Sequence, residues 1–254
     1  GKYLGRLNGE RAQGAMLENW RQGSALAQAL GEIAALPDST KNKEQLSPQA
    51  EAILRAMLDY PRSNLKGNKD DKQAQYALPD VLRAFAAFKA SDLGAVLRKH
   101  LSESDVVVRA TAADLLGDLP PTETNTRALA AALPIALADK DSNDAALAIV
   151  DALGKQKNQE ANEALKLILD TNDYSVLRRA VAHLKVNGAG DFSARVGTVE
   201  TRHTAADYRR ALARIGKKVQ ARVNTDKGSF VIELLSEEGP LNVDNFVQLA
   251  KRRY

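Results

Sequence analysis

The three histidines are the first candidates for chemistry in this sequence, because imidazole can act as a base, a proton shuttle or a metal ligand. His100, His183 and His203 lie far apart in the chain, and no two of them have the i, i+4 spacing by which one helix face holds a metal ion. We therefore expect each histidine to be a surface or interfacial residue. The sequence leads us to assign no catalytic, cofactor-binding or metal-ligating residue.

Other residue types that carry chemistry are missing or lack their usual context. The sequence has no cysteine, which excludes disulfides, thiolate metal sites and a cysteine nucleophile. It contains neither a G-x-G-x-x-G pattern nor a Walker pattern, and no serine stands in a nucleophile-elbow motif. We expect neither a cofactor nor a metal ion.

Cationic residues gather in one segment of the chain. Residues 195–222 contain eight lysine or arginine side chains and two acidic ones, whereas the whole chain of 254 residues has a net charge of +4. Aromatic residues, which would stack on bases, are not interleaved with these cations. We therefore favour a solvated helix that faces an acidic partner or domain over a nucleic-acid interface, an interpretation that a steep salt dependence of duplex DNA binding would reverse.

Three stretches of the chain share one apolar pattern. The shared positions are Val108, Ala112 and Leu116 in the first stretch, Ala145, Ile149 and Leu153 in the second, and Val176, Ala180 and Leu184 in the third. Steps of four residues place each set on one face of a helix. The sequence therefore predicts a repeated amphipathic helix.

An acidic residue precedes each stretch and can cap the helix that follows, at Asp105, Asp141 and Asp173. A second helical pattern separates successive stretches, so each unit reads as helix, turn, helix. Spacing and pattern resemble HEAT repeats, whose D-x-x-V-R-x-x-A-x-x-x-L motif is best matched by DVVVRATAADLL at residues 105–116. The resemblance implies an α-solenoid whose concave face binds protein or peptide partners.

Two further helix pairs are predicted upstream, which gives about five units over residues 1–187. Ser47 followed by Pro48 predicts a helix start, with a capping hydroxyl and then proline at the first helical position. Pro79 and Pro134 fall inside helical patterns and predict local kinks.

The helical period ends near Lys185. Residues 188–217 are predicted to be a linker that ends in a basic helix, and residues 218–254 form a third region. Alternating residues surround a TDKG turn and predict a β-hairpin: Val219, Ala221 and Val223 on one side, Phe230, Ile232 and Leu234 on the other. A helix follows, with Val243, Phe246, Val247, Leu249 and Ala250 expected to face a core.

The segment VNTDKGSFVIELLSEEGPLNVDNFVQLAKRRY resembles the start of a bacterial cyclophilin domain. The residues that match the family are Thr225, Gly228, Phe230, Ile232, Glu233, Leu234, Pro240, Leu241, Val243, Asn245, Phe246, Leu249 and Ala250. The sequence departs from the family at Gly239, Asn242 and Arg253. The fold class is thus expected to be an all-α solenoid followed by a hairpin and a helix from the start of a cyclophilin β-barrel.

The resemblance implies a peptidyl-prolyl cis–trans isomerase that needs no metal or cofactor. The family's catalytic arginine lies in a Phe-His-Arg segment after the first helix, which places it beyond Tyr254. No catalytic residue is therefore carried over, Phe246 is interpreted as packing only, and residues 1–254 are predicted to be inactive. The alternative is a non-enzymatic adaptor whose last segment caps the solenoid, since a hairpin plus one helix has too small a core to be stable alone.

The longest apolar run, residues 128–138, is too short to cross a bilayer, so we expect no membrane span. The periplasm is expected as the compartment, on general grounds for bacterial proteins with two such domains. The absence of cysteine fits the cytoplasm equally well.

Overall fold

The computed structural model describes residues 20–59, 76–197 and 203–254. The chain divides into two compact units, residues 1–197 and 198–254, which are treated separately below. The predicted linker of residues 188–217 spans this division.

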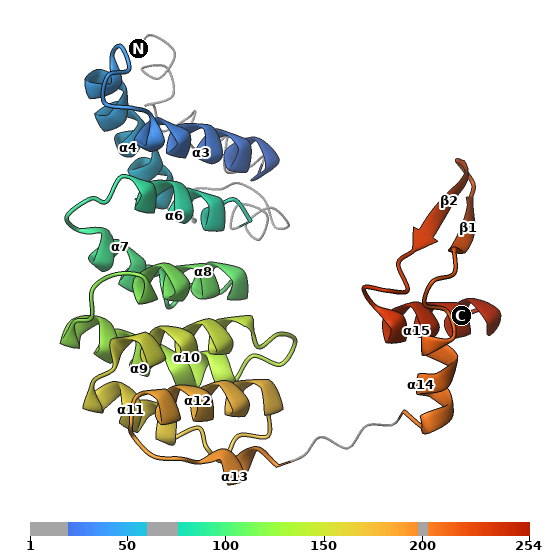
Figure 1. Ribbon diagram of the computed structural model, residues 1–254. Coiled ribbons are helices and arrows are strands. Elements are labelled where there is room, and N and C mark those ends of the chain that lie inside the picture. Colours follow the sequence, from blue (N-terminus) through green and yellow to red (C-terminus); the bar gives the residue numbers. More distant parts are fainter. Residues whose placement is uncertain (1–19, 60–75, 198–202) are drawn as a thin grey trace. The chain divides into compact units, whose positions relative to one another are not determined.

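The described part of the first unit is built from helices (Figure 1). The described helices are α3 (Trp20–Ala35), α4 (Lys43–Asp59), α6 (Leu78–Ala87), α7 (Leu93–His100), α8 (Val106–Gly117), α9 (Glu123–Leu137), α10 (Asp144–Gln156), α11 (Gln159–Lys166), α12 (Tyr174–Val186) and the short α13 (Ser193–Val196).

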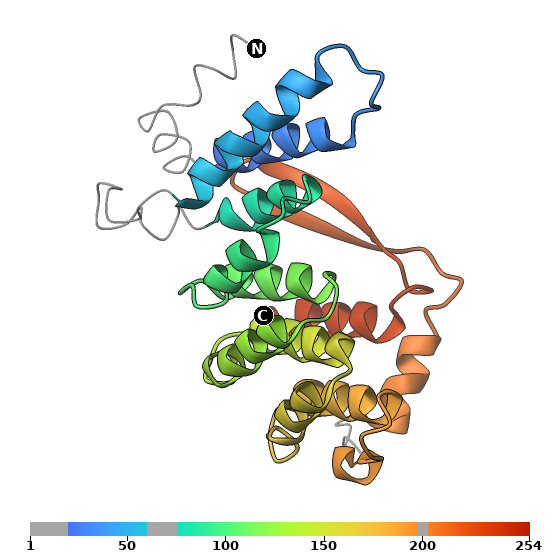
Figure 2. The ribbon, with the colours of Figure 1, turned by 90° about the vertical axis from the view of Figure 1, so that its left-hand side faces the viewer.

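The helices of this unit form two rows, each built from alternate helices of the chain. Helices α3, α6, α8, α10 and α12 pack side by side in chain order and are called the α8 row (Figure 1). Helices α7, α9 and α11 form the α9 row, while α4 packs against α3 and α6. Figure 2 shows the same helices after a quarter turn. This stacking of helix pairs is an α-solenoid, as the repeated pattern predicts.

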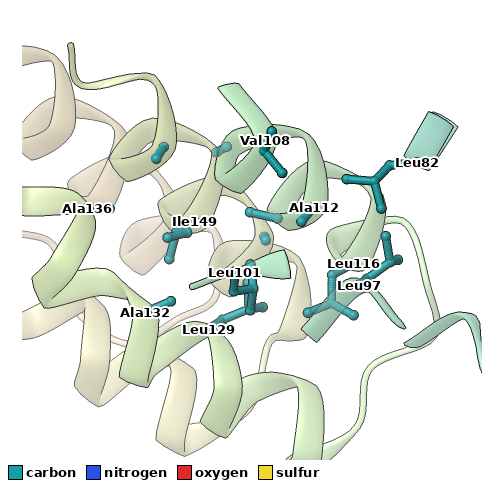
Figure 3. Packing of buried hydrophobic residues seen from close by; sticks show 14 of the residues in the cluster. Leu82, Leu97, Leu101, Val108, Ala112, Leu116, Leu129, Ala132, Ala136 and Ile149 are labelled. Carbon is teal, nitrogen blue, oxygen red and sulfur yellow. The ribbon is translucent and has the colours of Figure 1, made fainter. Parts of the chain in front are cut away.

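The repeated apolar positions are buried as the sequence predicts. The side chains at all nine positions, Val108, Ala112, Leu116, Ala145, Ile149, Leu153, Val176, Ala180 and Leu184, are 0 % exposed. They join the facing residues of the α9 row in one core, where Figure 3 shows Val108, Ala112, Leu116 and Ile149 beside Leu97, Leu101 and Leu129. Each repeat therefore completes its core with residues of its neighbours.

Small residues let the helices of the α8 row approach closely. A methyl group added at Gly117 in α8 would lie 2.9 Å from the Cα atom of Ala152 in α10. A methyl group at Gly31 in α3 would lie 3.0 Å from the Cβ atom of Ala84 in α6. Glycine is thus required at these crossings by the distance between the backbones.

Two of the three acidic turns cap their helices. The Asp105 carboxylate accepts the backbone N–H groups of Val107 and Val108, and Asp173 does the same for Ser175 and Val176. Asp141 was expected to act likewise, which is wrong. The middle turn has one more residue between its aspartate and the helical anchor, so α10 begins at Asp144, and the Ser142 hydroxyl accepts the Asp144 N–H at 3.2 Å.

The predicted roles of two prolines are also corrected. Helix α4 begins at Lys43 and contains Pro48 in its interior, because an extra turn precedes Ser47 and is anchored by a 2.9 Å bond from Lys43 Nζ to Asp38. Pro79 stands in the first turn of α6, where no intrahelical bond is lost, so it causes no kink there. Pro134 does lie inside α9.

The second unit contains a two-stranded antiparallel sheet, and along the chain one helix precedes the sheet and another follows it. Its elements are α14 (Ala205–Leu212), β1 (Val219–Thr225), β2 (Gly228–Leu234) and α15 (Pro240–Lys251). The strands pair in the register Val219↔Leu234, Ala221↔Ile232 and Val223↔Phe230. The hairpin itself is as predicted, and its register places the six alternating apolar residues on one face.

Candidate interaction surfaces

The exposed face of the α8 row carries charged side chains that connect neighbouring repeats. Lys155 of α10 donates to Asp118, the residue that follows α8, at 2.6 Å, and Arg83 of α6 donates to the Thr111 hydroxyl of α8 at 3.2 Å. Exposed pairs of this kind contribute about 0–1 kcal/mol each.

His183 belongs to this face and links α12 to α10. Its Nε2 lies 2.8 Å from Asp151 Oδ1, and Arg179 contacts the other carboxylate oxygen. The imidazole ring lies over Gly154, where an added methyl group would come within 2.2 Å of it. His183 is therefore a residue of the interface between α10 and α12. The Asp151 carboxylate binds its ring, and Gly154 leaves the space that the ring occupies.

On the exposed face of the α8 row, the surroundings of Asp114 disfavour its ionised carboxylate. Its pKa is raised above the usual value, first by burial and then by the negative charge of Asp151, with a smaller effect of Asp118. Asp151 occupies the same position in its repeat as Asp114, so the repeat itself brings like charges together. A cation or a backbone N–H group supplied by a partner would stabilise this carboxylate.

The other two histidines belong to different units of the chain. His100 ends α7 and is only 1 % exposed, with Nδ1 3.0 Å from Glu103 Oε1. His203 lies in the second unit, with its ring edge-on to Tyr208 at a centroid distance of 6.0 Å. Within residues 20–59, 76–197 and 203–254, no group of three His, Cys, Asp or Glu side chains could hold a metal ion.

A surface hollow of about 700 Å³ lies between the α6–α7 turn and the α8–α9 turn, and is called the turn hollow. Its lining residues are Ala86, Lys89, Ala90, Ser91, Asp92, Leu93, Gly94, Ala95, Arg98, Leu115, Asp118, Leu119, Pro120, Thr122 and Asn125. Sequence reasoning missed this site because turns from two different repeats form it.

A buried carboxylate holds the second unit together. Asp244 of α15 accepts hydrogen bonds from Nε and Nη2 of Arg210 at 3.1 and 2.8 Å, and Arg214 contacts its other oxygen. The Asp244 side chain is only 6 % exposed, and the two arginines hold its pKa below the usual value. Helix α14 is thus bound to α15 by charge.

Ion pairs within the chain involve several of the cations in residues 195–222. Arg210 and Arg214 bind Asp244, Arg195 contacts Asp170, and Lys218 lies 3.8 Å from Glu233. Several cations of the segment thus face carboxylates of this same chain. The sequence showed the cations but gave no sign that Asp244 would be buried between two of them.

The second unit leaves much of its apolar surface exposed. Phe230 is 54 % exposed and Val231 51 %, and of the residues expected to face a core in α15 only Val243 is buried. Phe246, predicted to pack, is 40 % exposed, and Ala250 is exposed as well. That prediction is wrong for these two residues, because within the second unit no described element covers their side of the helix.

Comparison with known families finds a match for one part of the chain. Residues 94–185, which extend from α7 into α12, match the family model described as HEAT repeats. This match supports a HEAT-repeat protein, and such repeats commonly mediate protein interactions. No curated protein and no solved structure matches the chain. None of the described helices is both long enough and apolar enough to cross a bilayer.

Proposed function

We propose that the protein is an interaction scaffold of HEAT repeats attached to a cyclophilin-type peptidyl-prolyl isomerase, of which the second unit is the opening segment. In this proposal the solenoid binds unfolded or partly folded proteins, and the isomerase acts on their Xaa-Pro bonds. The observation that carries it is the hairpin register, which places the family-like residues Phe230, Ile232 and Leu234 of β2 on one face, opposite apolar residues of β1.

The turn of the hairpin explains two of the residues on which the resemblance rests. The Thr225 hydroxyl donates to the Gly228 carbonyl at 2.8 Å and accepts the Lys227 N–H at 3.3 Å, which closes the turn. Gly228 has a φ of +131°, a conformation that side chains disfavour. The T-x-x-G spacing is thus a physical requirement of this turn.

The apolar face of the hairpin supports the same proposal. A two-stranded sheet is marginally stable in water and normally needs further strands or a packed helix. Phe230, Ile232 and Leu234 form a row that would become core if a barrel closed over it. We propose that such strands follow α15 and carry the catalytic groups.

The chemistry would be rotation about the prolyl amide bond, with no bond made or broken. The partial double-bond character of the amide makes the uncatalysed rotation slow. A cyclophilin-type site accelerates it with an arginine aimed at the prolyl amide. No residue of this chain is proposed for that role.

Two experiments test the proposal. The reading frame after the codon for Tyr254 should encode a Phe-His-Arg segment shortly after α15, and a stop codon there would contradict the isomerase. Residues 1–254 should leave the cis–trans relaxation of a proline-containing test peptide at its uncatalysed rate. Acceleration by these residues would contradict the assignment of the catalytic groups.

A non-enzymatic adaptor is the second candidate, favoured by the Arg210–Asp244 and Arg214–Asp244 contacts, which make α14 and α15 one packed unit. On this alternative the second unit serves binding alone. A version ending at Gly197 separates the two. An adaptor whose partner requires the second unit loses that partner, whereas the scaffold proposal predicts that unfolded clients still bind the solenoid.

A further inference from the structure

The turn hollow has an apolar floor beneath a polar rim. Leu93 is 5 % exposed, and Leu115 and Leu119 are half-buried at the same site. Gly94 keeps the floor open, because a methyl group there would lie 3.6 Å from Leu119 and 3.2 Å from the Arg98 guanidinium. The volume of about 700 Å³ lies within the range of sites that bind side chains or small molecules.

The carboxylates on the rim are already neutralised. Asp92 receives two hydrogen bonds from Arg55, at 2.6 and 2.9 Å, and the pKa of Asp92 is held below its usual value by that guanidinium. Asp118 receives the Lys155 ammonium at 2.6 Å. Neither acid is therefore available to a cation of the hollow.

The cations on the rim are not neutralised. Arg98 donates to the Asn125 side-chain oxygen at 2.6 Å, a neutral acceptor, and among the described residues it has no carboxylate partner. The same holds for Lys89, for which the described part of the chain provides no ion pair. The hollow thus combines an apolar floor with two positive charges that lack a counter-charge.

We propose that the turn hollow binds a protein segment that presents an apolar side chain next to carboxylates. The apolar side chain contacts Leu93 and Leu119, and the carboxylates face Lys89 and Arg98. Charge complementarity selects this partner, because the rim has free cations and no free acid. The inference rests on the scaffold part of the proposed function and is independent of the isomerase.

The structure supplies a matched pair of variants for the test. Lys89 and Lys157 both follow the end of a helix with a φ of +53°, but only Lys89 lines the hollow. Asparagine tolerates this left-handed conformation, so Lys89→Asn and Lys157→Asn remove one charge each without straining the fold. Lys157→Asn is therefore the control for Lys89→Asn.

A second pair tests the apolar floor. Ala95 is exposed in α7 and lines the hollow, so Ala95→Phe fills the hollow without disturbing the core. Ala131 is exposed in α9 and lies outside the hollow, so Ala131→Phe tests for effects of a new aromatic side chain alone.

The probes are fluorescein-labelled octapeptides measured by fluorescence polarisation with the full chain. One carries Leu or Phe between Glu residues, a second replaces Glu by Lys, and a third replaces the apolar residue by Ser. The first should bind most tightly, and its Kd should rise with salt. Lys89→Asn should weaken it about three- to tenfold and Ala95→Phe more strongly, while both control variants bind like the parent.

Three results would overturn the inference: no binding of the first peptide, equal binding of the Lys peptide, or equal weakening by Lys89→Asn and Lys157→Asn. These results leave the scaffold proposal standing if unfolded clients still bind the solenoid. Loss of client binding by a chain that still binds the Glu peptide would contradict the scaffold proposal and leave the hollow intact.

Discussion

The solenoid and the C-terminal unit differ in how completely they bury their apolar side chains. In the solenoid, every repeated anchor position from Val108 to Leu184 is 0 % exposed, because each helix pair is covered by the next. In the C-terminal unit, Ala211 and Val243 are the buried apolar side chains of the described residues, while Phe230 and Phe246 face solvent. A repeat is completed by its neighbours, whereas a hairpin between two helices leaves its apolar face uncovered.

The largest expected loss of stability comes from a substitution in the solenoid core, and the matching substitution in the C-terminal unit should cost much less. Leu153→Ala removes a fully buried side chain and should lower the free energy of unfolding of the solenoid by about 3 kcal/mol. Phe230→Ala, at a half-exposed position, should cost less than about 1 kcal/mol. Urea unfolding of both variants measures this, and equal costs would remove the distinction between the units.

Charge should matter more than apolar packing in the C-terminal unit. Asp244→Asn removes the negative charge shared by Arg210 and Arg214, together with one of the two acceptor oxygens, and should destabilise this unit by about 1–2 kcal/mol. The rates of amide hydrogen exchange in α14 and α15 measure this loss of stability. Unchanged exchange would mean that the unit does not depend on this contact.

The same carboxylate predicts a pH dependence. Because the Asp244 pKa is lower in the folded unit than in the unfolded chain, its contribution is complete above the unfolded value of about 3.9. The contribution is lost as the pH falls from there through the folded pKa. Asp244→Asn should abolish this part of the acid sensitivity of α14 and α15.

An effect of similar size tests the contact between two repeats. Gly154→Ala places a methyl group within 2.2 Å of the His183 ring and should cost about 1–2 kcal/mol, because the ring must leave Asp151. His183→Ala combined with Gly154→Ala should recover most of the loss from the glycine change. Additive losses in this double-mutant cycle would show that the ring is not the obstacle.

The smallest effect concerns the exposed charges of the α8 row. Asp114→Asn removes a carboxylate whose pKa is raised, so it should stabilise the solenoid at neutral pH by about 0.5 kcal/mol. The native state binds the proton more readily, so the wild-type penalty develops as the pH rises from the unfolded value through the folded one. The gain should therefore vanish near pH 3, and a destabilised variant at pH 7 would contradict the electrostatic argument.

Periodic features were predictable from the sequence. Steps of four residues placed Val108, Ala112 and Leu116 on one buried face, and period-two alternation gave the hairpin with Gly228 in its turn. Both patterns depend on side-chain direction alone, which the secondary structure determines. Asp105 and Asp173 were predictable as caps for the same local reason.

Features that depend on tertiary neighbours were not predictable. The Asp244 site joins residues 30 or more positions apart, as do the contact of Lys155 with Asp118 and the turn hollow. Phe246 looked like a core residue because apolar character alone does not say whether a covering element exists. Asp141 failed as a cap through a single extra residue in its turn.

Amide hydrogen exchange along the whole chain tests the central contrast most directly. Core amides of α8, α10 and α12 should exchange only on global unfolding of the solenoid, whereas the amides of β1 and β2 should exchange through local opening, orders of magnitude faster. Protection of Ala221 and Ile232 equal to that of Leu153 would contradict the account, because the hairpin would then have a complete core of its own.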